Sequence, residues 1–303
     1  MSYAVVIGAG ATGRAVARQL AEAGEQVKLV TRNGSGADAP LIDRIALDAA
    51  DADGLVRVVD GARTLFNCAM PRYDRWPQEF PALAAGMLEV AERAGVDYVM
   101  LGNVYGYGPV SGAVLEDHPL SPTSVKGRIR AKIWEDALHA HTAGRVRATE
   151  VRASDFLGHG AYSIYNLMVT PNVLAGSPAY YPGDLDVAHS WTYTEDAARA
   201  LIAASRSDAA WGKSWHVPPC ANISVRELTG QLAEMANAPS PQLIRMTAKD
   251  VVEMGRSDSI MAEVEEMLYL FEQPFEMSAA ATASVLSVQA SPMPEVLRDT
   301  LRP

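Results

Sequence analysis

Three glycines near the N-terminus have a spacing that can bind a phosphate group. Gly8, Gly10 and Gly13 form the stretch GAGATG, which follows an apolar run and opens a segment of helical periodicity. Gly8 would allow a tight turn, Gly10 a close approach of backbone to a pyrophosphate, and Gly13 close packing of helix on strand. The pattern predicts a dinucleotide-binding loop that includes Ala11 and Thr12, and the competing interpretation is a turn without a ligand.

The residues after the second expected strand distinguish the two nicotinamide cofactors. That strand covers residues 27–31 and ends in Thr31, Arg32 and Asn33. An NAD enzyme usually presents an acid there, whereas a guanidinium can pair with the 2′-phosphate of NADP through charge-assisted hydrogen bonds. The stretch therefore predicts NADP(H), unless Arg32 is a solvated surface arginine. Asp48 is expected either to accept a hydrogen bond from the adenine amino group or to cap the next helix.

Composition narrows the class of protein. Of the 303 residues, 49% are hydrophobic and 20% are charged, the balance of an ordinary globular protein. The net charge is −10 and no long Lys/Arg cluster offsets it, which argues against a nucleic-acid partner. Apolar runs fall far short of the roughly 20 residues that a membrane span needs. We expect neither nucleic acid nor a membrane as a partner.

The N-terminus, the cysteines and the histidines indicate a cytoplasmic protein without a metal. The stretch MSYAVVIGAG has no basic segment and enters a strand at once, so no signal peptide is expected. Cys68 and Cys220 lie far apart in the sequence, which suits a reducing compartment. The sequence has no CxxC or HExxH motif, and His139 and His141 would point to different faces of a helix.

Strands and helices alternate through the first half of the chain. Strands are expected at residues 3–8, 27–31, 44–47, 64–69, 98–101 and 146–151, and helices at 13–24, 51–62, 80–95 and 124–143. This alternation predicts an α/β, doubly wound parallel (Rossmann) sheet with helices on both faces. After residue 155 the periodicity weakens. We predict a dinucleotide-binding core over residues 1–155, and over residues 156–303 a smaller substrate-binding lobe and lid, with some segments returning to the core.

Further stretches carry a resemblance to a known family. FNCA, NVYGYGP, EDHPLSPTS, VRASDFLG and SWTYTEDAARA follow GAGATG in order, within about residues 4–205. With them the chain resembles the extended short-chain dehydrogenases/reductases of the NAD-dependent epimerase/dehydratase type, in an atypical branch. The resemblance implies a cofactor at the carboxyl ends of the strands, with a substrate above the nicotinamide and under the C-terminal lobe. By motif position it implies that Cys68, Ala69, Met70, Leu101 and Gly102 line the cofactor.

The chain departs from this family where its catalytic residues usually stand. The family usually has a Ser or Thr after the fifth strand and Tyr-x-x-x-Lys on the next helix. Here Lys126 and Arg130 take those two helix positions, and the serine region reads MLGN. We name Asn103 and Lys126 as catalytic candidates, Asn103 to polarise a carbonyl oxygen and Lys126 to stabilise the forming alkoxide. A lysine normally stays protonated to near pH 10, so Lys126 is no replacement for the tyrosine.

Residues 152–191 offer weaker signals. Arg152 and Asp155 in VRASD are expected to form a structural ion pair. The Tyr-, Met-, Leu- and Asn-rich stretch at residues 158–191 fits the apolar wall of a pocket for a large flat substrate, or equally core residues beneath loops. Tyr105 and Tyr107 offer further hydroxyl groups, of which Tyr105 is expected to pack in its loop.

Three functions stay open. The first is an NADPH-dependent ketoreductase of an aromatic polyketide ketone, angucyclinone-like, because the atypical branch includes such ketoreductases; a substrate phenol would then supply the proton. The second is a sugar-nucleotide epimerase or dehydratase, whose redox cycle depends on the missing tyrosine. The third is a non-catalytic NADP(H)-sensing protein. We expect a small-molecule aromatic ketone as substrate, and a monomer or a homodimer.

Overall fold

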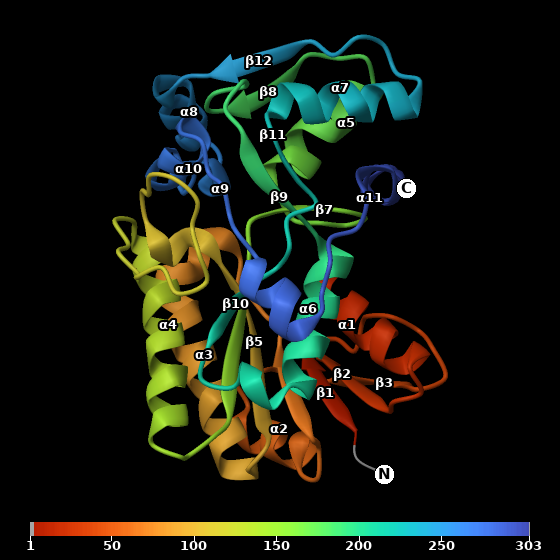
Figure 1. Ribbon diagram of the computed structural model, residues 1–303, viewed down its shortest axis with the longest axis vertical. Helices are drawn as coiled ribbons and strands as arrows, with labels where there is room; N and C mark the ends of the chain where they lie inside the picture. Colours follow the sequence, from red (N-terminus) through yellow and green to blue (C-terminus); the bar gives the residue numbers. More distant parts are fainter. Residues whose placement is uncertain (1–2, 303) are drawn as a thin grey trace.

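The computed structural model describes residues 3–302 and is built on a seven-stranded parallel sheet (Figure 1). Its strands are β1 (Ala4–Ile7), β2 (Val27–Thr31), β3 (Ile42–Ala46), β4 (Thr64–Asn67), β5 (Asp97–Asn103), β6 (Ala148–Ala153) and β10 (Ser214–His216). They lie in the order β3-β2-β1-β4-β5-β6-β10, and every neighbouring pair is parallel. The first six have the strand order of a Rossmann fold, which confirms the predicted fold class.

Helices cover both faces of this sheet because alternate strand residues point to opposite sides. Val6 packs toward one face with α1 and α6, while Val5 packs toward the other with α2, α3 and α4. The bounds are α1 (Ala11–Glu22), α2 (Ala52–Val59), α3 (Trp76–Ala94), α4 (Val125–Thr142) and α6 (Thr194–Arg206). Figure 1 shows α3 and α4 on one side of the strands and α1 and α6 on the other.

Local sequence explains where two of these helices begin. α3 begins at Trp76 rather than at residue 80, because Pro77 fits a first helical turn, where a missing N–H group costs nothing. α4 begins after Ser124, whose Oγ accepts a hydrogen bond from the Gly127 amide at 3.0 Å. Both helices run from the carboxyl-end side of the sheet, so their first turns lie near the ends of β4 and β5.

The rest of the chain forms a smaller lobe beside the carboxyl ends of the strands (Figure 1). Its strands are β7 (Asp155–Leu157), β9 (His189–Tyr193) and β11 (Ala221–Ile223) in one sheet, and β8 (Ala179–Pro182) with β12 (Leu243–Met246) in another. Its helices are α5 (Thr170–Leu174), α7 (Val225–Ala236), α8 (Ala248–Gly255), α9 (Ser259–Ala262), α10 (Tyr269–Glu272) and α11 (Met293–Thr300).

Single-turn helical segments complete the secondary structure. The 3₁₀ turns are η1 (Tyr73–Arg75), η2 (Val104–Tyr107), η4 (Asp208–Ala210) and η5 (Glu265–Met267), and the π-helical turns are η3 (Tyr165–Val169) and η6 (Thr282–Leu286). The stretch at residues 250–275, helical in its pattern, is thus divided into α8, α9, η5 and α10. One break lies at Asp258, whose carboxylate accepts from the Ile260 and Met261 amides and caps a new helix.

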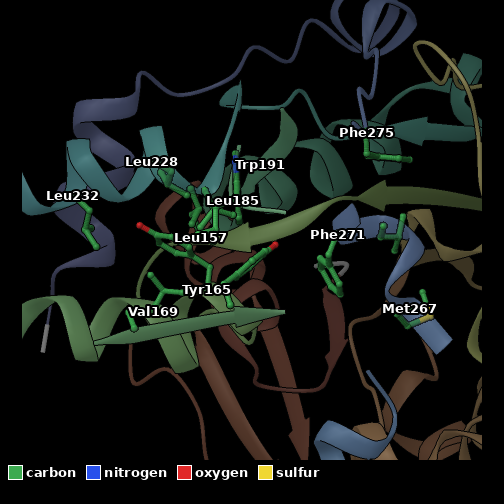
Figure 2. Close-up of a cluster of buried hydrophobic side chains, with 14 of the residues drawn as sticks. Leu157, Tyr165, Val169, Leu185, Trp191, Leu228, Leu232, Met267, Phe271 and Phe275 are labelled. Atoms are coloured by element: carbon green, nitrogen blue, oxygen red, sulfur yellow. The ribbon is translucent and has the colours of Figure 1, made fainter. Parts of the chain in front are cut away.

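An apolar core holds the lobe together. Figure 2 shows Leu157, Tyr165 and Trp191 pointing toward one another, and the Tyr165 and Trp191 rings lie 5.3 Å apart, edge to face. Trp191 Nε1 donates to the Ile223 carbonyl at 3.0 Å, which satisfies its one polar group. Part of the aromatic stretch at residues 158–191 is therefore core, whereas Tyr162 is exposed.

Two segments from the second half return to the large sheet. β10 extends its edge beside β6, and α6 packs on α1. The division of the chain at residue 155 remains a prediction, because β7 begins there within two residues of the end of β6. Among residues 3–302, no helix has both the length and the apolar character needed to cross a membrane.

Candidate functional site

A cavity lies between the carboxyl ends of the central strands and the lobe. Backbone and side chains at the ends of β1, β4 and β5 form one wall, which we call the cofactor wall: Gly10, Ala11, Thr12, Gly13, Cys68, Ala69, Met70, Leu101, Gly102 and Asn103. Residues of β7, η3, β9, α9 and α10, and of the segments that flank them, form the other wall. We call it the lobe wall: Ser154, Asp155, Tyr162, Ile164, Leu167, His189, Ile260, Val264, Leu270 and Phe271. Such a crevice at the carboxyl ends of the strands is where open α/β sheets bind ligands.

The three glycines of GAGATG have the geometry that a dinucleotide requires. Gly8 has φ +97°, and a Cβ there would approach the Ala69 amide nitrogen to 2.8 Å. A Cβ on Gly13 would overlap the carbonyl oxygen of Gly8, so helix and strand pack at a distance that only glycine allows. A Cβ on Gly10 would meet nothing within 4 Å. Gly10 therefore leaves open space beside backbone at the N-terminus of α1, and this space fits a pyrophosphate.

Gly102 and Cys68 show what lies behind the cofactor wall. A Cβ on Gly102 would overlap the carboxylate of Glu150, a buried side chain on the neighbouring strand β6. Burial raises the pKa of the Cys68 thiol to about 12, so this thiol stays protonated at neutral pH. Neither position presents a charged group to the cavity.

The residues expected to bind the adenosine half of the cofactor are not among those that line the cavity. Thr31 Oγ1 donates to the Ser35 carbonyl at 3.0 Å, and Asn33 Oδ1 accepts from the Ser35 amide at 3.2 Å. Arg32 is exposed and makes no ion pair with the described residues. Asp48 Oδ1 accepts from the Ala50 amide at 3.0 Å. Asp48 thus forms a local turn.

The cap of α2 is a different aspartate from the one expected. Asp51 Oδ1 accepts from the Gly54 amide at 2.9 Å, so Asp51 is the N-cap and not Asp48. The structure leaves Asp48 four residues before the start of α2, in the loop that follows β3. A contact of Asp48 with adenine remains a prediction.

Lys126 points to the lobe and is fully buried. Its ammonium forms ion pairs with Glu263 and with Glu266, the latter at 3.1 Å, and lies 4.5 Å from the centre of the Tyr73 ring. The Glu266 carboxylate also accepts from the backbone amides of Val125 and Lys126, at 2.5 and 3.2 Å. The lysine is therefore engaged in holding α4 to the segment at residues 263–266, and it is not part of the cavity lining.

Arg130, one turn later, does line the cavity. Its guanidinium lies over the rings of Trp76 and Phe80, at 4.9 and 4.7 Å, and Nη1 donates to the Leu101 carbonyl at 3.0 Å. Among the ion pairs of residues 3–302, none involves Arg130. Burial lowers the pKa of this guanidinium to about 10, and it remains a cation at neutral pH.

Asn103 and two tyrosines supply polar groups where β5 ends. Asn103 Oδ1 accepts from the Tyr105 amide at 3.2 Å, so its amide nitrogen is the atom that remains for a ligand oxygen. Tyr105 also lines the cavity rather than only packing in its loop, and its hydroxyl lies 3.5 Å from that of Tyr73. Burial raises the pKa of both phenols. Tyr107, in contrast, is buried, and its hydroxyl lies 2.6 Å from His216 Nε2.

The expected ion pair of Arg152 with Asp155 is wrong. Arg152 Nε donates to Glu150 at 2.6 Å and Nη1 donates to the Tyr107 hydroxyl at 2.7 Å, within a buried network. Asp155 Oδ2 instead lies 2.8 Å from His189 Nε2. Successive strand residues point to opposite faces, so Arg152 and Asp155, three apart and across the end of β6, face different surroundings.

Sequence reasoning missed the residues that bring polar chemistry to the lobe wall. Ser154 and His189 line the cavity with Asp155, and Ser154 Oγ lies 3.3 Å from His189 Nε2. A pairing over more than thirty residues leaves no periodic signal. The one available signal was a lone histidine at residue 189, in the aromatic-rich stretch that leads into β9.

Comparison with known proteins gives the family. The model of the NAD dependent epimerase/dehydratase family matches residues 4–217, more than half of the chain. The chain belongs to this family. Among curated proteins, no sequence matches it.

Solved structures share the fold across nearly the whole chain. Epimerase Mth375 of Methanothermobacter thermautotrophicus is 20% identical, with a TM-score of 0.81, covering 99% of this chain and 91% of its own. The UDP-glucuronic acid 4-epimerase of Bacillus cereus, in complex with NAD, is 15% identical, with a TM-score of 0.80 and coverages of 99% and 95%. DesIV of Streptomyces venezuelae, a dTDP-glucose 4,6-dehydratase, is 18% identical, with a TM-score of 0.77 and coverages of 98% and 96%. At these identities the likeness concerns the fold.

Proposed function

We propose that this member of the family is an NADPH-dependent ketoreductase that reduces an aromatic, polyketide-type ketone to a secondary alcohol, with an angucyclinone-like ring system as the substrate class. The observation that supports it most is the pairing of an intact glycine loop with a lobe wall made largely of Ile164, Leu167, Val264, Leu270 and Phe271. Apolar and aromatic walls with few polar anchors suit large flat ligands.

The cofactor proposal rests on the cofactor wall and on Arg32. The loop at residues 8–13 would hold the pyrophosphate, and the segments at 68–70 and 101–102 would lie along the nicotinamide half. The exposed guanidinium of Arg32, with no ion-pair partner among the described residues, is available to a 2′-phosphate. We therefore assign NADP(H) rather than the NAD bound by the Bacillus cereus epimerase.

The reduction needs a hydride, a polarised carbonyl and a proton. The nicotinamide, when bound, supplies the hydride to the carbonyl carbon. Asn103, through its amide nitrogen, donates a hydrogen bond to the ketone oxygen as the carbon–oxygen π bond breaks. A phenol of the substrate, hydrogen-bonded to the same oxygen, gives its proton to the alkoxide, and the phenolate regains a proton from water.

We assign the proton to the substrate phenol because of where Lys126 lies. Its ammonium is engaged by Glu263 and Glu266, so it is not aimed at a ligand in the cavity. The hydroxyls of Tyr73 and Tyr105 have a raised pKa because they are buried, and a weaker acid is a poorer proton donor. A substrate that carries its own acid next to the ketone removes the need for a protein acid.

A sugar-nucleotide epimerase or dehydratase is the second candidate, and the family favours it. Two observations weigh against it. The position of the family's catalytic tyrosine holds Lys126, and Arg130 is the one Lys or Arg among the described residues that line the cavity. One guanidinium, whose Nη1 already donates to the Leu101 carbonyl, is less than the several cations that would best neutralise a diphosphate.

The discriminating experiment follows NADPH absorbance with a hydroxyanthraquinone-type ketone. Separately, it follows conversion of a UDP-sugar by chromatography of the product, because an epimerase or dehydratase regenerates its own cofactor and consumes no NADPH. Turnover of the ketone alone supports the ketoreductase. The methyl ether of the phenol beside the ketone should react at least roughly a hundredfold more slowly, the scale of a lost acid catalyst. Turnover of the UDP-sugar alone would overturn the proposal. Tight NADPH binding without turnover of either compound would identify a non-catalytic, NADP(H)-sensing protein.

A further inference from the structure

A carboxylate faces the cavity from the lobe wall and is held there by a buried histidine. Asp155 begins β7 and its side chain is 23% exposed, whereas His189 begins the neighbouring strand β9 and its side chain is 5% exposed. His189 Nε2 lies 2.8 Å from Asp155 Oδ2 and 3.3 Å from Ser154 Oγ. Within this pair, Asp155 is therefore the group that a ligand can reach, and His189 lies behind it.

The imidazole of His189 cannot easily turn away from the carboxylate. The ring of Trp191 lies 5.3 Å from it, edge to face, and the ring of Phe275 lies 5.7 Å from it. The β9 backbone is fixed as well, because the Ser190 amide donates to the Phe275 carbonyl and the Phe275 amide donates to the Ala188 carbonyl. A rigid donor thus fixes Oδ2 and leaves the lone pairs of Oδ1 for a ligand.

The groups around Asp155 leave its negative charge without a strong cation. The phenols of Tyr73 and Tyr105 and the hydroxyl of Ser154 line the same cavity. Of the described Lys, Arg and His side chains, only His189 comes within ion-pair distance of Asp155. A ligand hydroxyl would gain a charge-assisted hydrogen bond here, whereas a ligand phosphate would meet a like charge.

We propose that Asp155, positioned by His189, determines substrate specificity: its carboxylate accepts a hydrogen bond from a hydroxyl of a neutral polyhydroxylated aromatic ligand and disfavours phosphate-bearing ligands. This inference rests on the proposed function only in placing the ligand in this cavity. In the proposed reaction the substrate itself supplies the proton. The inference adds that Asp155 is the protein residue that selects the substrate.

The inference about Asp155 is tested by measuring ligand affinity rather than turnover. Quenching of protein fluorescence measures the affinity for a dihydroxyanthraquinone and for its dimethyl ether, since Trp76 lines the cavity. The wild type should prefer the hydroxylated compound by roughly tenfold to a hundredfold, the value of a hydrogen bond to a charged group. Asp155→Asn, which keeps the shape and removes the charge, should reduce this preference to about threefold or less. The dimethyl ether is the internal reference, because a misfolded variant would lose affinity for both compounds.

Two variants of His189 separate positioning from packing. His189→Gln keeps an N–H donor toward Asp155 and should retain most of the preference for hydroxyl groups. His189→Phe fits between the rings of Trp191 and Phe275 but has no donor, and it should lose the preference while still binding the dimethyl ether. An unchanged preference in folded Asp155→Asn protein would overturn the inference. A hydroxyl preference without any NADPH turnover would instead refute the proposed reduction and leave this specificity residue in place.

Discussion

The two walls of the cavity are built in different ways. The cofactor wall consists mainly of backbone and small side chains at the ends of three adjacent strands, all within residues 10–103. The lobe wall takes larger side chains from segments scattered over residues 154–271 and brought together by long-range packing. Strand order fixes the first wall, so it keeps the pattern of the family. The lobe wall depends on individual side chains, so a single substitution can alter it without disturbing the strand order.

The largest expected effect is on the cofactor wall. Gly10→Val should fold normally but weaken NADPH binding by more than about a thousandfold, because the valine would occupy the open space beside the loop. Gly13→Ala is the matched control: its methyl group would overlap the Gly8 carbonyl, so it should lower the melting temperature instead. Calorimetric melting and a binding titration separate the two. Normal NADPH binding by folded Gly10→Val would mean that the loop is only a turn.

The next effect concerns the link between the two walls. Lys126→Ala leaves Glu263 and Glu266 without their buried cation and should cost about 3 kcal/mol of unfolding free energy in urea. Lys132→Ala, on the same helix, removes an exposed ion pair with Asp136 and should cost less than about 0.5 kcal/mol.

The same lysine variant tests the source of the proton. With saturating NADPH, single-turnover reduction by Lys126→Ala should slow by roughly tenfold or less, as expected for a group outside the cavity. A rate reduced beyond about a thousandfold, with cofactor affinity intact, would show that Lys126 is the acid after all.

The next prediction compares the affinities of the protein for NADPH and NADH. The wild type should bind NADPH more tightly than NADH by roughly tenfold to a hundredfold, because Arg32 is exposed and available to the 2′-phosphate. Arg32→Asp should reverse the preference, and Arg44→Asp on β3, whose arginine lies 3.8 Å from Asp38, is the control of equal charge change. Equal wild-type affinities for the two cofactors would contradict the assignment.

The last prediction concerns the pH dependence of stability, which depends on His216 behind the cofactor wall. Burial lowers its pKa to about 4, with Arg152 and His118 adding to the decrease and the Ser278 carbonyl opposing it. The unfolded chain therefore binds a proton between about pH 6.5 and 4 that the folded chain does not. Stability is complete above that window and is lost as the pH falls through it, by about 2 kcal/mol between pH 7 and pH 5.

Urea unfolding at the two pH values measures this loss. His216→Gln should flatten the pH dependence, while His139→Gln, on the exposed face of α4, should leave it unchanged. A wild-type stability that does not fall between pH 7 and pH 5 would mean that His216 is protonated in the fold.

The sequence predicted the fold class and the placing of the glycine loop because these depend on local periodicity and on steric rules for glycine. The strands at β1, β2 and β4 were found from apolar runs alone. The side-chain direction of Lys126 was beyond reach, because its carboxylate partners lie more than 130 residues later. The partner of Asp155 was beyond reach for the same reason. Arg152 is close to Asp155 in the sequence and was the expected partner, whereas His189, 34 residues later, is the residue that pairs with it.

Cys68 has a consequence for what the cavity can tolerate. Hydroxyanthraquinone-type ligands can be electrophiles toward thiolates, and Cys68 is a thiol on the cavity lining. Because burial raises its pKa to about 12, this thiol stays protonated at pH 7 and carries little of the reactive thiolate. On the proposed function, the burial that raises this pKa would slow any reaction of an electrophilic ligand with Cys68.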